Sequence, residues 1–278
     1  MITLRHRETG ESLLEWPGDT LAGAELAGAV LLYADLRGAN LGGANLRGAD
    51  LCQADLRGAV FDGANLAGAD ITLANLAGAS FRNAILADAR LQAVTLDLSG
   101  PARTDFRSAE LTRVNLKNSN LSGSTFADAE MRRIDLTHVD LSGSDLSGAN
   151  LTEANFSYSK LRGADLSYSM LVSALFNAVD LEGASLRHTD LTFAVLNGAE
   201  LTDADLSSAL LSQTVIARCP SLSRARGLDT LELLSQSSLD LATLRHALEH
   251  LPDELLAKIG VEREQLAALR SATSGATR

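Results

Sequence analysis

The sequence predicts a solenoid, a chain wound into stacked coils, over residues 21–216. Counting in fives from Leu21 to Ile216 gives forty positions, of which thirty-nine hold Leu, Phe, Ile or Met and one holds Pro101. From Leu26 onward, an uncharged small or β-branched residue lies two positions before each of these, from Ala24 to Thr214. A period of five fits neither an α-helix nor a flat strand. Stacked coils, in contrast, bring equivalent side chains into one continuous core.

The repeated units are similar to those of a known family. Ala-Asn-Leu-Gly-Gly at 39–43, Ala-Asp-Leu-Arg-Gly at 54–58 and Ala-Asn-Leu-Ala-Gly at 74–78 resemble pentapeptide-repeat proteins. The resemblance covers 21–216 and implies an all-β solenoid, namely a right-handed quadrilateral β-helix. One unit would form each side, so twenty residues would form a coil and the repeat would make about ten coils. The central large residue and the small residue two before it would point inward.

Residues 1–20 lie outside the repeat and predict an N-terminal β cap. Two apolar stretches, Ile2 to Arg7 and Ser12 to Trp16, read as short strands around a turn at 8–11. We expect them to cover the open first coil, because the ends of a solenoid expose core and unpaired backbone. A binding role is the alternative. Within the repeat, glycine is frequent two residues after the centre, where a corner would need positive φ.

The repeat becomes irregular near 98–104. Pro101 occupies a core position but has no N–H to donate to a neighbouring coil. We therefore expect a bulge or loop, with Leu98 filling part of the core. Such a loop could be a projecting contact or simply a tolerated defect.

Residues 217–278 predict a C-terminal helical segment. Ser238 is a suitable N-cap for a first helix, Pro252-Asp253-Glu254 can start a second that Gly260 ends, and 262–272 reads as a third. These helices could cover the apolar stripe and last coil in cis, or join two copies in a homodimer. The candidate helical cap has apolar residues at 3-4-3 spacing: Leu241, Leu244, Leu248 and Leu251.

The outer surface carries an unequal charge. The whole chain has a net charge of −11, and sixteen acids of the repeat stand immediately before a central residue. Folding residues 140–210 at twenty per coil separates an acidic half from an apolar half, and an exposed apolar stripe normally marks a binding site. The candidate acidic interaction face comprises Asp140, Asp145, Asp165, Asp180, Glu200 and Asp205. The candidate apolar docking stripe comprises Met170, Val172, Leu175, Phe193, Val195, Leu210 and Val215.

Nothing in the sequence indicates catalysis, a cofactor or a metal. His246-Ala247-Leu248-Glu249-His250 matches the H-x-x-E-H pattern of zinc peptidases. However, Leu248 belongs to the predicted packing stripe, and no further ligand is evident. A filled rod also lacks the concave pocket that small-molecule sites use. We therefore expect a protein that is not an enzyme.

Two functions fit these features. The first is a non-catalytic protein-interaction or scaffold rod. The second, suggested by resemblance to quinolone-resistance members of the family, is an acidic DNA mimic that binds DNA gyrase or topoisomerase IV and protects it from inhibitors. About ten coils would span about 48 Å, over which duplex DNA carries about 28 charges. The repeat carries 23 acids and 14 bases, a balance of −9, so strong mimicry is not indicated.

The expected partners are proteins, including a type II topoisomerase in the second reading, and a second copy of the chain. Direct nucleic-acid or membrane binding is not expected. Two cysteines provide no disulfide framework, and no signal peptide or apolar span is evident. The sequence thus predicts a bacterial, cytoplasmic protein.

Overall fold

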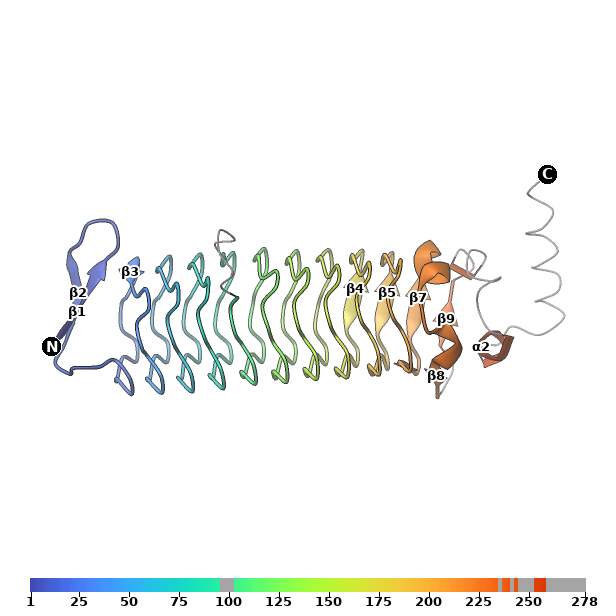
Figure 1. Ribbon diagram of the computed structural model, residues 1–278, viewed down its shortest axis with the longest axis horizontal. Helices are drawn as coiled ribbons and strands as arrows, with labels where there is room; N and C mark the ends of the chain where they lie inside the picture. The colour runs from blue at the N-terminus through green and yellow to red at the C-terminus, as the bar shows by residue number, and fades with distance from the viewer. Residues whose placement is uncertain (96–102, 235–236, 241–242, 245–252, 259–278) are drawn as a thin grey trace.

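The computed structural model describes residues 1–95, 103–234, 237–240, 243–244 and 253–258, and the repeat forms a long rod of stacked coils (Figure 1). The hairpin of β1 and β2 lies at one end of the rod, and β8, β9 and α2 lie at the other. The elements are β1 Ile2–His6, β2 Ser12–Trp16, β3 Ala34–Asp35, β4 Leu175–Asn177, β5 Val195–Asn197, β6 Leu210–Leu211, β7 Val215–Ala217, η1 Pro220–Arg224, η2 Leu228–Thr230, β8 Glu232–Leu233, β9 Ser238–Leu239 and α2 Asp253–Lys258.

Each coil is joined to the next by parallel β-bridges at four positions. The first set joins Glu25 to Asn45, Val30 to Asp50, Asp35 to Asp55, and Asn40 to Val60. These four bridges define faces A, B, C and D of the rod, in that order, and the same faces continue coil by coil. Four bridges in every twenty residues correspond to a β-helix with four sides.

The core has the composition that the repeat predicts. Every described central residue from Leu21 to Ile216 is buried, and most have no exposed surface. Burying each such side chain stabilises the fold by about 1.5–3 kcal/mol. On face D, the rings of Phe61, Phe81, Phe106 and Phe126 stack with centroids 4.8–5.0 Å apart. The interior is therefore a filled aliphatic and aromatic column.

The register changes across the irregular stretch. Ser80 bridges to Asp105, and the next two bridges also join residues twenty-five apart, whereas the preceding and following bridges join residues twenty apart. The ladders thus pass over one unit of five residues, so the prediction of about ten coils from forty units counts one unit too many. The expected positions of Leu98 and Pro101 fall outside the described residues. Thr104 re-enters the core, where its buried hydroxyl donates to the Leu76 carbonyl at 2.7 Å.

The backbone conformation at the corners explains why glycine is frequent two residues after a centre. It also shows that other residues can adopt this conformation. The residue two after each centre has a left-handed backbone, as at Gly38 with φ 64°. Tyr158, Phe193 and many other non-glycine residues adopt the same conformation there, with φ values from 51° to 63°. Such φ values are uncommon outside glycine, asparagine and aspartate. The corners consequently present large side chains to the outside.

The N-terminal hairpin continues the backbone pairing of face C. β1 is antiparallel to β2 and also to β3, with Arg5 opposite Asp35. β1 ends at His6, one residue earlier than predicted. Leu4 is buried in the core, and the indole N–H of Trp16 donates to the Thr20 carbonyl at 2.9 Å. The hairpin therefore covers the first coil with both apolar side chains and backbone hydrogen bonds.

The C-terminal part differs from the predicted helical segment, because the described residues 220–234 and 237–240 add further pairing to the end of the solenoid. β8 pairs in parallel with β6, and β9 pairs in parallel with β7. The last regular coil has backbone groups that need partners, and this stretch satisfies them. The prediction that Ser238 is an N-cap is wrong, since Ser238 lies in β9. The Asp240 carboxylate instead accepts from the Thr243 N–H at 2.9 Å.

Two leucines of the tail complete this end of the core. Leu244 is 8% exposed and Leu256, in α2, is fully buried in the same apolar cluster. Within the described residues, these two side chains therefore pack in the same apolar cluster as the end of the solenoid, and capping in cis by the whole tail stays a prediction. Leu241, Leu248, Leu251 and the third predicted helix lie outside the described residues, and homodimerisation stays a prediction.

Candidate interaction surfaces

The acids that precede the central residues have a structural role. All twelve aspartates at this position accept a hydrogen bond at Oδ1 from the backbone N–H two residues later, for example Asp145 from Ser147 at 3.0 Å. All eight asparagines there do the same. Side chains of this kind stabilise turns by such local bonds. The acids are therefore explained by the fold before any partner is considered.

The candidate acidic face lies on faces C and D, as the sequence predicts, but most of its charge is paired. Asp140 lies 3.4 Å from Lys160, Asp180 3.6 Å from Arg162, and Asp205 3.3 Å from Arg187. Glu200 lies 3.7 Å from Arg224 of η1, a counterion that the repeat register could not reveal. Among the described residues, Asp145 and Asp165 have no cation within 4 Å, although the charge of Asp145 contributes to raising the pKa of Arg107.

Three of these carboxyls have lowered pKa values. Burial acts to raise the pKa of Asp140, but hydrogen bonds from Ser142 and Lys160 outweigh it. Burial likewise opposes the lowering of the pKa of Asp205, where Ser207 and Arg187 prevail, and of Glu200, where Thr202 and Arg224 prevail. These carboxylates are thus held in their charged form by the rod itself. A partner would meet fewer free charges than the residue count suggests.

The candidate apolar docking stripe lies on faces A and B and on the corner between them. Leu175, Val195 and Val215 are bridged to one another in β4, β5 and β7. Phe193 stands on the corner and is 50% exposed, and Met170 on face A is 46% exposed. Val172, Val195 and Leu210 are partly exposed. The described part of the tail does not cover this stripe. Most of the predicted tail helices lie outside the described residues, so covering of the stripe by these helices stays a prediction.

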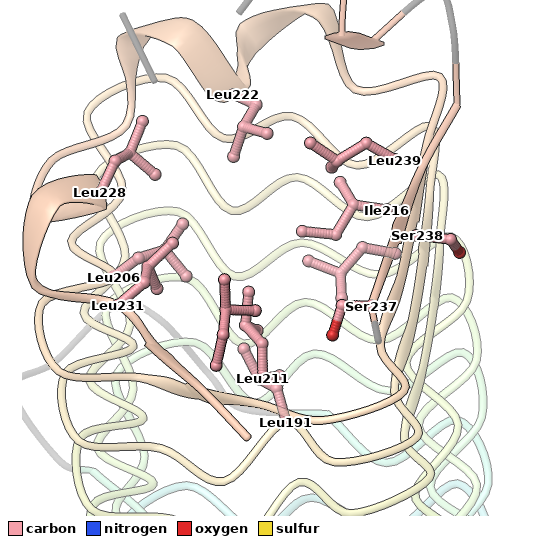
Figure 2. Close-up of a pocket in the computed structure, with 12 residues that line it drawn as sticks. Leu191, Leu206, Leu211, Ile216, Leu222, Leu228, Leu231, Ser237, Ser238 and Leu239 are labelled. Atoms are coloured by element: carbon pink, nitrogen blue, oxygen red, sulfur yellow. The ribbon is translucent and has the colours of Figure 1, made fainter. Parts of the chain in front are cut away.

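The end of the rod holds an apolar cavity, but it is too small for a ligand. Figure 2 shows Leu191, Leu211 and Ile216 of the last regular coils facing Leu222 and Leu239 of the added coil. The cavity between them measures about 20 Å³, which is room for about one water molecule. This space belongs to the core of the cap.

The remaining titratable residues assemble no metal site in the described part of the chain. No group of three or more His, Cys, Asp or Glu residues is placed to hold an ion there. His6, His138 and His188 stack on Tyr33, Tyr158 and Tyr168, with centroids 4.8–5.1 Å apart. The H-x-x-E-H motif at 246–250 lies outside the described residues.

The same described residues contain no helix long and apolar enough to cross a bilayer. Cys219 is buried and its thiol lies 3.5 Å from the Leu196 carbonyl, while Cys52 is partly exposed, and both are free. Burial raises the pKa of the Cys219 thiol, so it is not an activated nucleophile. The geometry offers surfaces for binding rather than groups for chemistry.

Comparisons with known proteins agree with this architecture. The family described as Pentapeptide repeats matches eight copies over residues 20–48, 39–76, 64–99, 102–128, 129–167 and 174–213. The chain is similar to HetL, a pentapeptide repeat protein involved in heterocyst differentiation regulation from the cyanobacterium Nostoc sp. strain PCC 7120. Identity is 28%, coverage is 74% of this chain and 91% of HetL, and the TM-score is 0.70.

A second similar structure is a trypsin-treated form of QnrB1, a plasmid-mediated fluoroquinolone resistance protein. Its identity is 16%, coverage is 74% of this chain and 93% of QnrB1, and the TM-score is 0.54, so this likeness concerns the fold alone. No curated protein sequence matches the chain. With repeats matched over most of its length, the chain belongs to the pentapeptide repeat family.

Proposed function

We propose that this protein is a non-catalytic rod that binds protein partners through its outer faces. The apolar stripe carries this proposal, because most of its side chains stand at outward positions where most other coils place Asn, Asp or Glu. The core does not need them, and exposed apolar patches on soluble rods mark interaction sites. HetL, the relative with the higher TM-score of the two, is described as taking part in regulation, which suits a binding role.

A pull-down with matched variants tests this proposal. Val195→Thr and Val215→Thr keep the β-branched shape but replace a methyl group by a hydroxyl. We expect partners recovered by the intact rod from its host lysate to be lost with this double variant. Asp145→Asn with Asp165→Asn should leave them in place. Recovery that depends only on the acidic residues would contradict the assignment of the stripe.

The alternative, an acidic DNA mimic that binds DNA gyrase or topoisomerase IV, is supported by the acidic face and by the fold shared with QnrB1. Two observations weigh against it. The aspartates are turn acceptors throughout the repeat, and four of the six candidate acids have a cation within 4 Å. Their charge is therefore largely neutralised locally.

A gyrase assay decides this alternative. Supercoiling is measured with a fluoroquinolone, with and without the protein, over a salt titration. Protection that falls steeply with salt and disappears in the triple variant Asp145→Asn, Asp165→Asn, Asp205→Asn would establish mimicry. We expect no protection, because the rod has about a third of the charge of a duplex of equal length.

The oligomeric state can be tested by comparing the mass of the full chain with that of a chain truncated beyond the last coil. Residues 220–240 belong to the solenoid, so removing them would open its core. Light scattering should compare the full chain with a chain ending at Lys258. One-chain mass for both would support capping in cis, whereas a two-chain mass that falls to one on truncation would support a homodimer.

A further inference from the structure

We infer that the apolar stripe docks an amphipathic α-helix of a partner protein, with one Lys or Arg of that helix set against Asp190. The inference rests on the proposed protein-binding role and names the kind of partner. Leu175, Val195 and Val215 occupy successive coils on face B. Side chains in neighbouring coils are about 4.8 Å apart. This spacing is close to the 5.4 Å rise of one helical turn, so a helix along the rod meets one coil per turn.

Asp190 is the feature that defines the partner's charge. It lies on face A directly between Met170 and Leu210, with which it forms β-bridges. Its Oδ1 accepts from the Thr192 N–H at 2.9 Å, and it forms no ion pair with any residue that the structure describes. A purely apolar partner would bury this carboxylate without compensation, which is costly. A partner with a single cation at this point would not.

The other charged side chains beside the stripe do not replace that cation. Glu153 on the same corner as Phe193 is paired with Arg133 at 2.8 Å. Arg218 stands on the corner between faces B and C, the opposite edge of face B, and its backbone N–H donates to Asp240. The net charge of −11 further favours a basic partner during the encounter.

The size of the stripe favours one helix over a second rod. Three coils cover about 15 Å along the axis, and the five residue steps from Met170 to Leu175 span about 16 Å at most. The resulting patch of about 250 Å² is well below the roughly 800 Å² per partner of a stable interface between folded proteins. A helix of about three turns matches it in length, and contacts elsewhere on such a partner would add to the affinity.

The test uses three fluorescent peptides of about 14 residues, designed as helices with Leu at i, i+3, i+4, i+7 and i+11. The three peptides differ at one position only. In the centre of the apolar side, one carries Lys, one carries Leu and one carries Glu. Anisotropy with the full chain should show the Lys peptide binding about tenfold more tightly than the Glu peptide, the ratio expected for a partly buried ion pair. Asp190→Asn should remove this preference, and Asp190→Lys should reverse it.

Matched variants separate docking from folding. Asp190→Asn retains the turn, because eight asparagines make the same bond at equivalent positions. Phe193→Asn should abolish peptide binding. Leu73→Asn should not, although Leu73 is also a corner residue with φ 61° and is equally exposed at 50%. Asparagine tolerates this conformation, so both variants should melt at or above the wild-type temperature.

The outcomes divide clearly. Absence of binding by all three peptides, binding indifferent to residue 190, or a two-chain mass lost in Phe193→Asn would each overturn helix docking. If partner recovery from lysate still depended on Val195 and Val215, the protein-binding role would stand without it. If partner recovery did not depend on Val195 and Val215 either, both the helix docking and the protein-binding role of the stripe would be wrong.

Discussion

The most direct test of the structure is a pair of substitutions at Asp145 that separates charge from turn stabilisation. Asp145→Asn removes the charge but keeps a side-chain carbonyl as acceptor. Asp145→Ala removes both. If the acids before the central residues are turn acceptors first, only the alanine variant should lose stability.

The structure sets the expected magnitude. Asp145 Oδ1 accepts from the Ser147 N–H at 3.0 Å and from its hydroxyl at 2.6 Å, and Oδ2 accepts from the Thr125 hydroxyl at 3.3 Å. Because no cation lies within 4 Å in the described part of the chain, no ion pair is lost. Losing these bonds should destabilise the coil by about 1–2 kcal/mol, whereas asparagine should cost less than about 0.5 kcal/mol.

Thermal unfolding followed by far-UV circular dichroism measures the difference. In a chain of this size, 1 kcal/mol corresponds to about 2–4 °C in Tm. The alanine variant should therefore melt about 2–8 °C below the wild type and the asparagine variant less than about 2 °C below it, provided that the coils unfold cooperatively. Equal Tm values for the two variants would refute the turn-acceptor role. If that shared Tm lay below the wild-type value, the charge itself would stabilise the coil.

Three other predictions concern the core, the register and pH. Phe106→Ala should cost about 3–5 kcal/mol in urea unfolding, because it empties a buried position between Phe81 and Phe126, and an unchanged midpoint would contradict the stack. Deleting 98–102 should keep the far-UV spectrum and lower Tm by no more than about 2 °C, because every remaining bridge could then join residues twenty apart; loss of the spectrum would show that the extra unit is required. Burial raises the pKa of Asp55, but Arg57 outweighs this and holds the pKa below its ordinary value. Its stabilisation is therefore complete above about pH 4 and lost as the pH falls through the folded pKa, so Tm should be level from pH 7 to 5 and drop below pH 4. A Tm that rises below pH 4 would contradict this.

The period of five, with a large and a small inward residue, predicts a solenoid and its core. The resemblance to pentapeptide-repeat proteins implies the four sides, which agree with bridges at four positions in every twenty residues. The sequence also predicts the two strands of the N-terminal hairpin and the outward apolar side chains, since both depend on local pattern, whereas docking at the stripe stays a prediction. One signal was available but unused. The spacing of Phe61, Phe81, Phe106 and Phe126 already contains the step of twenty-five that keeps the rings in one column.

The tertiary structure decided the features that depend on the stacking register of the coils. Pairing of Glu200 with Arg224 and of Asp205 with Arg187 requires the stacking register, so the effective charge of the acidic face could not be counted from composition. The fate of 220–240 was decided in the same way. The sequence predicts a helical segment from residue 217, but β8 and β9 pair with the open backbone of the last coil and make hydrogen bonds that a separate helix would leave unmade. The local sequence limits which secondary structures a segment can form. The unpaired backbone of the neighbouring coil then selects one of them, because its N–H and C=O groups need hydrogen-bond partners.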